Sequence, residues 1–369
     1  MNNMNIDKKE LNRIVEDELN KIIEKESHRI NKSESKTQEK PGVNKFDEKA
    51  LKIVAIGGGT GLSTLLRGLK ERTKNITAIV TVADDGGGSG VLREDLGMLP
   101  PGDIRNCILA LANTEPILAQ LLNFRFQEGM LKGQNFGNLF LAAMNGVCGG
   151  FEEAVQRMSD VLAVTGRVLP VTLEDIQLCA GMSDGGCVVG ESKIPKYAIE
   201  HQCSIDGAFL RPIVVQPSPE VLTAIREADV IVLGPGSLFT SIIPNLLVNG
   251  IADELEKSKA CKIYICNVMT QPGETTGFTV TEHLRKIEDN TGKRFIDCCL
   301  VNNTDVPEEI RSRYQKDSAE PVLLKADEAG RCPGIRFIEK DLVDFRGGLV
   351  RHNSAKLADA LFELVKAVM

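Results

Sequence analysis

The chain has 369 residues, of which 42% are hydrophobic and 26% are charged, as is usual for a soluble globular protein. Its net charge of −7 and aromatic content of 4% argue against a nucleic-acid binder, because no block of lysine and arginine stands beside aromatic side chains. No stretch approaches the roughly 20 apolar residues of a membrane helix, and the first residues lack the apolar core of a signal peptide. The ten cysteines form no CxxC pair. The sequence therefore predicts a cytoplasmic protein with reduced thiols and no membrane span.

Residues 1–47 form a charged extension that is rich in lysine, glutamate, asparagine and serine. Apolar residues recur within it at helical spacing and predict an amphipathic helix over Asp7–Arg29, followed by a solvated linker. Two interpretations stay open. The extension either has no function, or its helix docks on a partner or on a second copy of the chain to form a homo-oligomer. The apolar residues are Leu11, Ile14, Val15, Leu19, Ile22 and Ile23.

Residues 48–369 alternate short β-branched strands with amphipathic helices. This pattern predicts the α/β class, with a doubly wound, mostly parallel, Rossmann-like sheet. A helical stretch over Thr114–Val164 and a hairpin over Gln177–Gly190 predict an insertion at about residues 115–215. The predicted strands of the sheet are Ile53–Ile56, Ile76–Val82, Val230–Leu233, Lys262–Asn267 and Cys299–Asn302.

A glycine turn follows the first predicted strand and precedes a helix predicted over Ser63–Arg72. Such a turn lets backbone N–H groups converge on a phosphate at the positive end of the helix. A plain turn that only joins strand and helix is the alternative. The candidate ligand-binding residues in this turn are Gly58, Gly59, Thr60 and Gly61.

Two carboxylates, Asp84 and Asp85, follow the second predicted strand, at the sheet edge where ligands bind in open α/β folds. They can accept hydrogen bonds from ribose hydroxyls or hold Mg²⁺ for a diphosphate. The alternative is a cap for the glycine-rich turn that follows them. Mg²⁺ is the one cofactor that the pattern suggests.

Two helix starts carry polar residues that can either cap the helix or bind a ligand. Asp103, Arg105 and Asn106 precede one apolar helix, and Asn135 and Asn138 flank a glycine at the start of the next. Asp103 and Asn135 are both suitable caps. A cation such as Arg105 is disfavoured in a first helical turn, so a bound anion there would compensate it.

A second glycine turn follows the strand Val230–Leu233 and repeats the pattern of the first at an equivalent sheet edge. The next strand ends in another polar loop. Near the C-terminus, Arg351 can reach an anion, while Asn353 or Ser354 caps a helix predicted over Lys356–Val368. The candidate residues in the turn and the loop are Gly234, Pro235, Gly236, Ser237, Asn267 and Thr270.

Two other chemistries have little support. The four histidines stand at no metal-ligand spacing, which disfavours zinc hydrolysis and histidine triads. Leu62 occupies the third glycine position of the dinucleotide fingerprint, so a nicotinamide-dependent oxidoreductase is a weak alternative.

Six motifs, in order and spacing, resemble the YvcK-type gluconeogenesis factors of the UPF0052 / CofD-like family, over Lys52 to the C-terminus. The resemblance implies a bacterial, cytoplasmic regulator that binds UDP-sugars such as UDP-N-acetylglucosamine in these motifs. It also implies a role in cell shape and peptidoglycan synthesis on gluconeogenic carbon, with envelope-synthesis proteins as partners and no catalytic residue. The motifs are Gly57–Gly61, Ala83–Gly87, Met98–Asn106, Asn135–Asn138, Gly234–Leu238 and Met269–Thr275.

A more distant resemblance is to CofD, the 2-phospho-lactate transferase, which implies a Mg²⁺-dependent transfer of a phospho-acid from a nucleotide-activated donor. The second glycine turn departs from the transferase pattern, since Gly236-Ser237 stands where those enzymes resemble Ser-Asn. Ser354 stands where YvcK-type relatives carry a hydroxyl that Ser/Thr kinases phosphorylate. The resemblance thus suggests a phosphosite beside Arg351.

Overall fold

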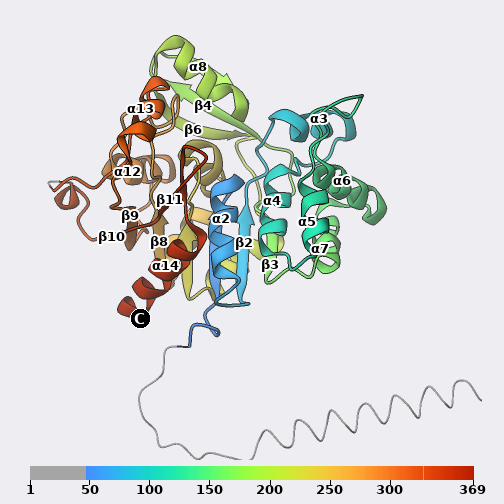
Figure 1. Cartoon of the computed structure of the whole chain (residues 1–369), viewed down its shortest axis with the longest axis horizontal. Coiled ribbons are helices and arrows are strands. Elements are labelled where there is room, and N and C mark those ends of the chain that lie inside the picture. The colour runs from blue at the N-terminus through green and yellow to red at the C-terminus, as the bar shows by residue number, and fades with distance from the viewer. Residues whose placement is uncertain (1–46, 327) are drawn as a thin grey trace, which may run out of the picture. The chain divides into compact units, whose positions relative to one another are not determined.

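The computed structural model describes residues 47–326 and 328–369 (Figure 1). The helix predicted over Asp7–Arg29 and its linker lie outside these residues. A seven-stranded parallel sheet, in the order β10-β9-β8-β7-β1-β2-β3, forms the centre of the fold. Its strands are β1 (Ile53–Gly57), β2 (Ile76–Val80), β3 (Arg167–Pro170), β7 (Val230–Leu233), β8 (Cys261–Ile265), β9 (Cys298–Asn302) and β10 (Arg336–Lys340).

The parallel sheet that the sequence predicts is confirmed, and all five predicted strands belong to it. Residues of β1, β2, β7, β8 and β9 are buried throughout, as expected for inner strands covered on both faces. The prediction lacks the two edge strands. β3 ends in a proline, and β10 alternates exposed and half-buried residues, so neither has the continuous apolar run of an inner strand.

The strand order reverses between β1 and β7, which are neighbours in the sheet. Ile53 pairs with Ile76 on one side and with Val230 on the other. Chain order runs outward from β1 to β2 and β3, and in the opposite direction from β7 to β10. Open α/β sheets bind ligands at such a switch point, outside the carboxyl ends of the strands.

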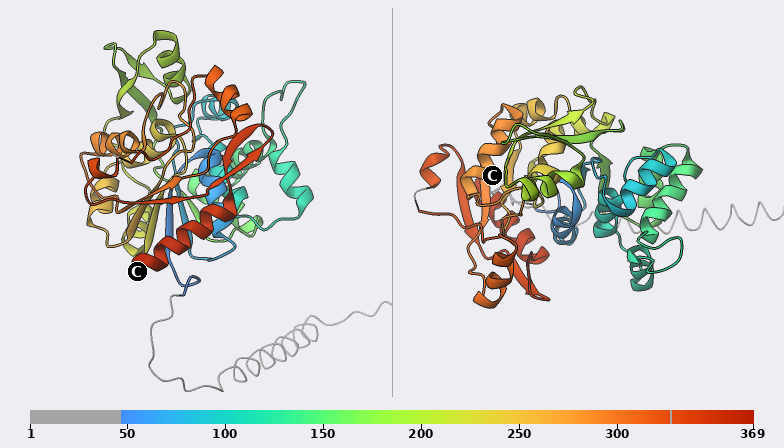
Figure 2. Two further views of the ribbon diagram at one scale, coloured as in Figure 1. Left: turned by 60° about the vertical axis from the view of Figure 1, so that its left-hand side comes forward. Right: turned by 90° about the horizontal axis from the view of Figure 1, so that it is seen from above.

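Helices cover both faces of the sheet, because right-handed crossovers that run in opposite directions leave their helices on opposite sides. α2 packs against α4 and against α14 (Figures 1 and 2), while α9 packs against α11 and α10 against α12. These helices are α2 (Gly59–Leu69), α4 (Gly102–Leu111), α9 (Pro219–Glu227), α10 (Ile243–Leu246), α11 (Ile251–Lys257), α12 (Val280–Thr291) and α14 (Ser354–Val368).

The segment expected to be an insertion, about residues 115–215, is divided by β3, which pairs with β2 in the main sheet. Before β3, the chain is helical as predicted. After β3, the predicted hairpin pairs with β6 in a small antiparallel sheet. The helices of this segment are α5 (Pro116–Asn123), α6 (Phe136–Cys148) and α7 (Phe151–Val161), and the small sheet contains β4 (Gln177–Met182), β5 (Cys187–Val189) and β6 (Ile205–Arg211); α3 (Gly87–Leu96) precedes the segment.

The small sheet and the segments between its strands form a cap at the carboxyl edge of the main sheet, uppermost in Figure 1. We define the cap as β4, β5 and β6 together with η1 (Glu191–Lys193) and α8 (Ile194–His201). A hairpin of β11 (Val343–Arg346) and β12 (Leu349–His352) leads into α14. The remaining elements are η2 (Leu238–Ile242), a π-helical turn, α13 (Glu308–Lys316) and η3 (Ala329–Arg331).

Two smaller predictions concern membranes and thiols. Among the described residues, no helix is long and apolar enough to cross a lipid bilayer. All ten cysteines, which lie within the described ranges, are free thiols, and Cys298 and Cys299 belong to the buried strand β9.

Candidate ligand-binding site

A cavity of about 960 Å³ opens at the switch point of the sheet. Both glycine turns, the loop after β8, the strand β12 and the cap contribute to its wall. Most of the residues singled out in the sequence meet there, although they come from segments far apart in the chain. Those that line it are Gly58, Gly59, Thr60, Gly61, Asp84, Asp103, Asn106, Pro235, Gly236, Ser237, Asn267, Thr270 and Arg351.

The two glycine turns touch each other at the base of the cavity. A Cβ atom on Gly61 would lie 2.4 Å from the carbonyl oxygen of Pro235, so only glycine allows this approach. The buried amide of Asn245 donates a hydrogen bond to the Gly57 carbonyl at 3.0 Å and ties α10 to the end of β1. The backbone N–H groups of two helix starts therefore face one cavity, which suits an anion.

The first helix begins earlier than predicted, at Gly59 instead of Ser63, and ends at Leu69. The glycines are therefore its first turn, with Gly58 as an extended N-cap that has no capping side chain. The carboxylate of Asp103 accepts a hydrogen bond from the Gly59 N–H and supplies the missing partner. Asp103 thus serves α2 from a neighbouring helix.

Asp103 does not cap its own helix, which corrects one of the two interpretations of this segment. Pro101 is the N-cap of α4, and Asp103 lies in its first turn. Arg105 is 7% exposed, and its guanidinium donates a 2.6 Å hydrogen bond to Asn106 Oδ1. Asn106 lines the cavity and Arg105 does not, so Arg105 acts on the site through Asn106.

The two neighbouring aspartates, Asp84 and Asp85, contact different parts of the protein. Asp84 lines the cavity and accepts a 2.9 Å hydrogen bond from the Gly86 N–H. Asp85 lies outside the cavity wall and accepts a 2.8 Å hydrogen bond from the Ser192 N–H of the cap. Among residues 47–326 and 328–369, no three His, Cys, Asp or Glu side chains are grouped to hold a metal ion. Asp84 and Asp85 thus have different hydrogen-bond partners, and of the two only Asp84 lines the cavity.

Asn135 and Asn138 support the helix α6 and do not line the cavity. Asn135 is the N-cap, and its side chain accepts a hydrogen bond from the Asn138 N–H at 3.2 Å. This confirms the capping interpretation of Asn135. The Asn138 amide is buried and lies 3.5 Å from the Ser89 hydroxyl. Gly234 also lies behind the wall, at the start of the second turn.

The loop after β8 carries a chain of side-chain hydrogen bonds across the cavity floor. The Asn267 amide donates to Gln271 Oε1 at 3.1 Å, and the Gln271 amide donates to the Ser237 hydroxyl at 2.7 Å. These bonds couple the loop to the second glycine turn. Thr270 binds the backbone of Glu320 with both its N–H and its hydroxyl, each at 2.8 Å.

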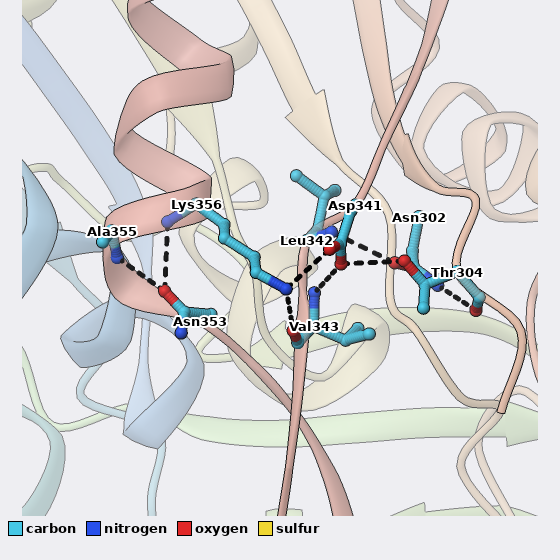
Figure 3. Close-up of polar contacts among 8 residues, drawn as sticks. All are labelled: Asn302, Thr304, Asp341, Leu342, Val343, Asn353, Ala355 and Lys356. Carbon is cyan, nitrogen blue, oxygen red and sulfur yellow. Dashed lines mark hydrogen bonds and ion pairs between the residues drawn. The ribbon is translucent and has the colours of Figure 1, made fainter. Parts of the chain in front are cut away.

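Arg351 lies on the β11–β12 hairpin and lines the cavity. A network of polar contacts holds the base of this hairpin (Figure 3). Asn353 caps α14 by accepting hydrogen bonds from the backbone N–H groups of Ala355 and Lys356, which settles the choice between Asn353 and Ser354. Lys356 then donates to Asp341 at 2.6 Å and to the Val343 carbonyl at 2.8 Å. The hairpin that carries Arg351 is thus fixed to the start of α14.

Four of the carboxyl groups that line the cavity have a pKa above the usual range. Burial is the main cause in every case, and the neighbouring carboxyls add to it for three of them. The pKa of Asp84 is raised, that of Asp103 is raised to about 7, that of Glu191 to about 8 and that of Glu274 to about 7. Burial also lowers the pKa of His352 to about 4, so this imidazole is neutral at pH 7. Arg67 and Arg351 are the cations of the described cavity wall.

The pKa of Glu274 gives a pH dependence of stability. Its carboxyl holds a proton in the folded state up to about pH 7, whereas the unfolded chain releases it near pH 4.5. This group therefore lowers the free energy of unfolding as pH rises through that window, by roughly 3 kcal/mol. We expect Glu274→Gln to reduce the loss of stability between pH 5 and pH 8, measured by urea denaturation at both. Equal pH dependence in wild type and variant would contradict the assignment.

Several residues of the wall were not predicted. Glu191 comes from the cap. Gln271 and Glu274 belong to the predicted motif Met269–Thr275 but were not among its individual candidate residues. Thr64 and Arg67 lie one and two turns into α2. The helical period places them on the same face as Thr60, so the sequence could have indicated that they line the same wall. The unpredicted polar residues of the wall are Thr64, Arg67, Glu191, Thr240, Ser241, Gln271, Glu274, Tyr314, Asp317 and His352.

Comparison with known proteins agrees with this architecture. Residues 53–343 match the family model of 2-phospho-L-lactate transferase CofD. A protein of Thermoanaerobacterium thermosulfurigenes is 56% identical over 315 residues, which are 85% of this chain and 97% of that relative. The gluconeogenesis factor of Bacillus subtilis (strain 168) is 48% identical over 316 residues, 85% of this chain and 98% of the relative.

A solved structure has the same fold. The crystal structure of a UPF0052 protein from Bacillus halodurans superposes with a TM-score of 0.80 at 46% identity and covers 84% of this chain and 98% of that one. The family model spans most of the chain, and the relatives match nearly over their full length. The chain therefore belongs to the CofD / UPF0052 family, among the proteins named gluconeogenesis factors.

Proposed function

We propose that this protein binds a UDP-sugar, UDP-N-acetylglucosamine, in the cavity at the switch point and acts as a regulator without turning the ligand over. The observation that carries the proposal is the meeting of two helix N-termini, at Gly59–Gly61 and Ser237, with Arg67 and Arg351 in one wall. Backbone N–H groups and guanidinium groups are the usual partners of a diphosphate. A cavity of about 960 Å³ also has room for a nucleotide and a sugar.

The regulatory part of the proposal follows the resemblance to gluconeogenesis factors. In this role the protein supports cell shape and peptidoglycan synthesis during growth on gluconeogenic carbon, and it acts on envelope-synthesis proteins.

Calorimetry of UDP-N-acetylglucosamine with the purified full chain tests the binding site. We expect Arg351→Ala to weaken binding by roughly 10- to 100-fold, because one charge-assisted hydrogen bond to the diphosphate is lost. Arg346→Ala is the matched control, since Arg346 lies on the same hairpin and pairs with Asp344 at 2.6 Å outside the cavity. Failure of the wild type to bind the UDP-sugar, or equal affinity in both variants, would contradict the proposal.

Ser354 is proposed as a site whose phosphorylation by a Ser/Thr kinase lowers the affinity for the ligand. It is the first residue of α14 and lies three residues after Arg351. A phosphate there would compete with the ligand's diphosphate for the Arg351 guanidinium. We expect Ser354→Glu to lower UDP-sugar affinity about three- to tenfold, as befits a partly solvated charge pair. Calorimetry with Ser354→Ala as control measures this, and unchanged affinity in the glutamate variant would count against the phosphosite.

A CofD-like transferase is the second candidate, and the match of residues 53–343 to that family model favours it. It would consume a nucleotide-activated phospho-acid in the presence of Mg²⁺. The separation of Asp84 from Asp85 does not support a metal site built on the pair. Preference for GTP with Mg²⁺ over UDP-N-acetylglucosamine, or consumption of the ligand during a parallel incubation, would favour this candidate over the regulator.

A further inference from the structure

One buried carboxylate oxygen in the cavity has no partner. Glu274 is 7% exposed, and its Oε1 accepts a hydrogen bond from the Thr240 hydroxyl at 3.3 Å. Its Oε2 is buried and has no partner at hydrogen-bonding geometry among the described residues, while the backbone N–H groups of Phe239 and Thr240 lie close enough to the carboxyl to oppose the rise in its pKa. Leaving a buried acceptor unsatisfied is costly, and the cost is recovered when a ligand donates to it. Because Thr240 fixes Oε1, the orientation of Oε2 is fixed as well.

A second carboxyl reaches the same wall from the cap. Glu191 lines the cavity, and within the described part of the chain its carboxyl accepts no hydrogen bond. The cap is seated close to the loop that carries Glu274, since a Cβ on Gly273 would lie 2.3 Å from the Pro195 carbonyl oxygen. The Ser192 N–H also donates to Asp85, and the Gly190 N–H donates to the Leu178 carbonyl, so the residues on both sides of Glu191 are anchored.

We infer that Glu191 and Glu274 form the subsite that receives the hydroxyl groups of the sugar and that selects a nucleotide sugar over the bare nucleotide. The inference rests on the proposed function. Each carboxyl offers an acceptor oxygen in both protonation states and one donor when it is protonated, so a ligand group that both donates and accepts hydrogen bonds suits this wall. Vicinal hydroxyls of a hexose meet this need. The diphosphate would be repelled by the ionised form of either carboxyl and belongs at the glycine turns.

Calorimetric titration with two probes, UDP and UDP-N-acetylglucosamine, tests this selectivity in the full chain. The variants are Glu191→Gln and Glu274→Gln, and the control is Glu200→Gln, an exposed residue of the same cap. In Glu274→Gln, the amide oxygen stays with Thr240, and the amide nitrogen replaces the free acceptor. We expect the ratio of the UDP dissociation constant to the UDP-sugar dissociation constant to fall about tenfold in each cavity variant, with UDP affinity unchanged or higher.

The outcomes separate the two proposals. If the wild type binds the UDP-sugar and both cavity variants keep the wild-type ratio, the sugar subsite is wrong while the proposed function stands. If the loss of a carboxyl raises the affinity for UDP and for the UDP-sugar by the same factor, the two residues act only through their charge and the inference also fails. If Mg²⁺ raises the affinity for UDP in the wild type but not in the variants, a cation binds at Glu191 and Glu274, and the sugar subsite is wrong. If the wild type binds neither probe, both proposals fall. Circular dichroism confirms that each variant is folded.

Discussion

Replacing Gly61 by alanine is expected to weaken UDP-N-acetylglucosamine binding by roughly 100-fold or more, because the cradle for the diphosphate moves. The added Cβ would lie 2.4 Å from the carbonyl oxygen and 2.8 Å from the carbonyl carbon of Pro235. Both atoms belong to the backbone at the end of β7, so no side chain can rotate away. Relief requires the two glycine turns to separate, at a cost of about 1–3 kcal/mol in the free energy of unfolding.

Calorimetry and urea denaturation of Gly61→Ala measure both effects. Gly88→Ala is a suitable control, because Gly88 also lies in the first turn of a helix, α3, but outside the cavity wall. A Cβ there would lie 2.8 Å from the flexible amide end of Gln134, which can move aside. Wild-type affinity in Gly61→Ala would show that the contact between the turns does not shape the site.

The second large effect is expected at Gly68, on the opposite end of the same helix. A Cβ at this position would lie 2.1 Å from the Ser354 carbonyl oxygen, so α2 and α14 could not keep their close approach (Figure 2). We expect Gly68→Ala to lower the free energy of unfolding by about 1–3 kcal/mol, as for other overpacked contacts. The control, Gly146→Ala, has open space around it in the exposed part of α6 and should gain roughly 0.5–1 kcal/mol.

Urea denaturation of both variants compares two identical chemical changes with opposite expected signs. Because each adds one methyl group to a helical glycine, helix propensity alone predicts stabilisation in both. A stabilised Gly68→Ala variant would mean that the contact between α2 and α14 yields easily. A destabilised Gly146→Ala variant would mean that α6 needs its glycine for a reason other than packing.

The sequence predicts the centre of this fold well because inner parallel strands carry an unbroken apolar run. β1, β7 and β8 stand out for this reason, and the polar turns after them fall at one sheet edge by topology alone. The edge strand β3 lacks that signal. Because β3 was not predicted, the helices before it and the small sheet after it were predicted as one continuous insertion.

The site was only partly predictable, because a polar residue at a helix start has two uses that the sequence cannot separate. Asn135 caps α6, while Asp103 was a plausible cap for α4 but serves α2 across space. Glu191 left no local signal. The motif Met269–Thr275 contains Glu274 but does not show that its carboxyl meets Glu191, since this depends on how the cap packs against the loop after β8. Only tertiary packing brings these two carboxyls together.

The place of the β11–β12 hairpin has a consequence for synthesis of the chain. The first glycine turn is synthesised early, whereas Arg351 and the helix α14 that packs on α2 are synthesised after the whole parallel sheet. Until then, the nascent chain carries α2 without the helix that covers it. A chain that stops before Val343 would contain all seven strands of the sheet, yet it would lack Arg351 and the cover of α2. The cavity wall and the packing of α2 are therefore completed only after the sheet itself.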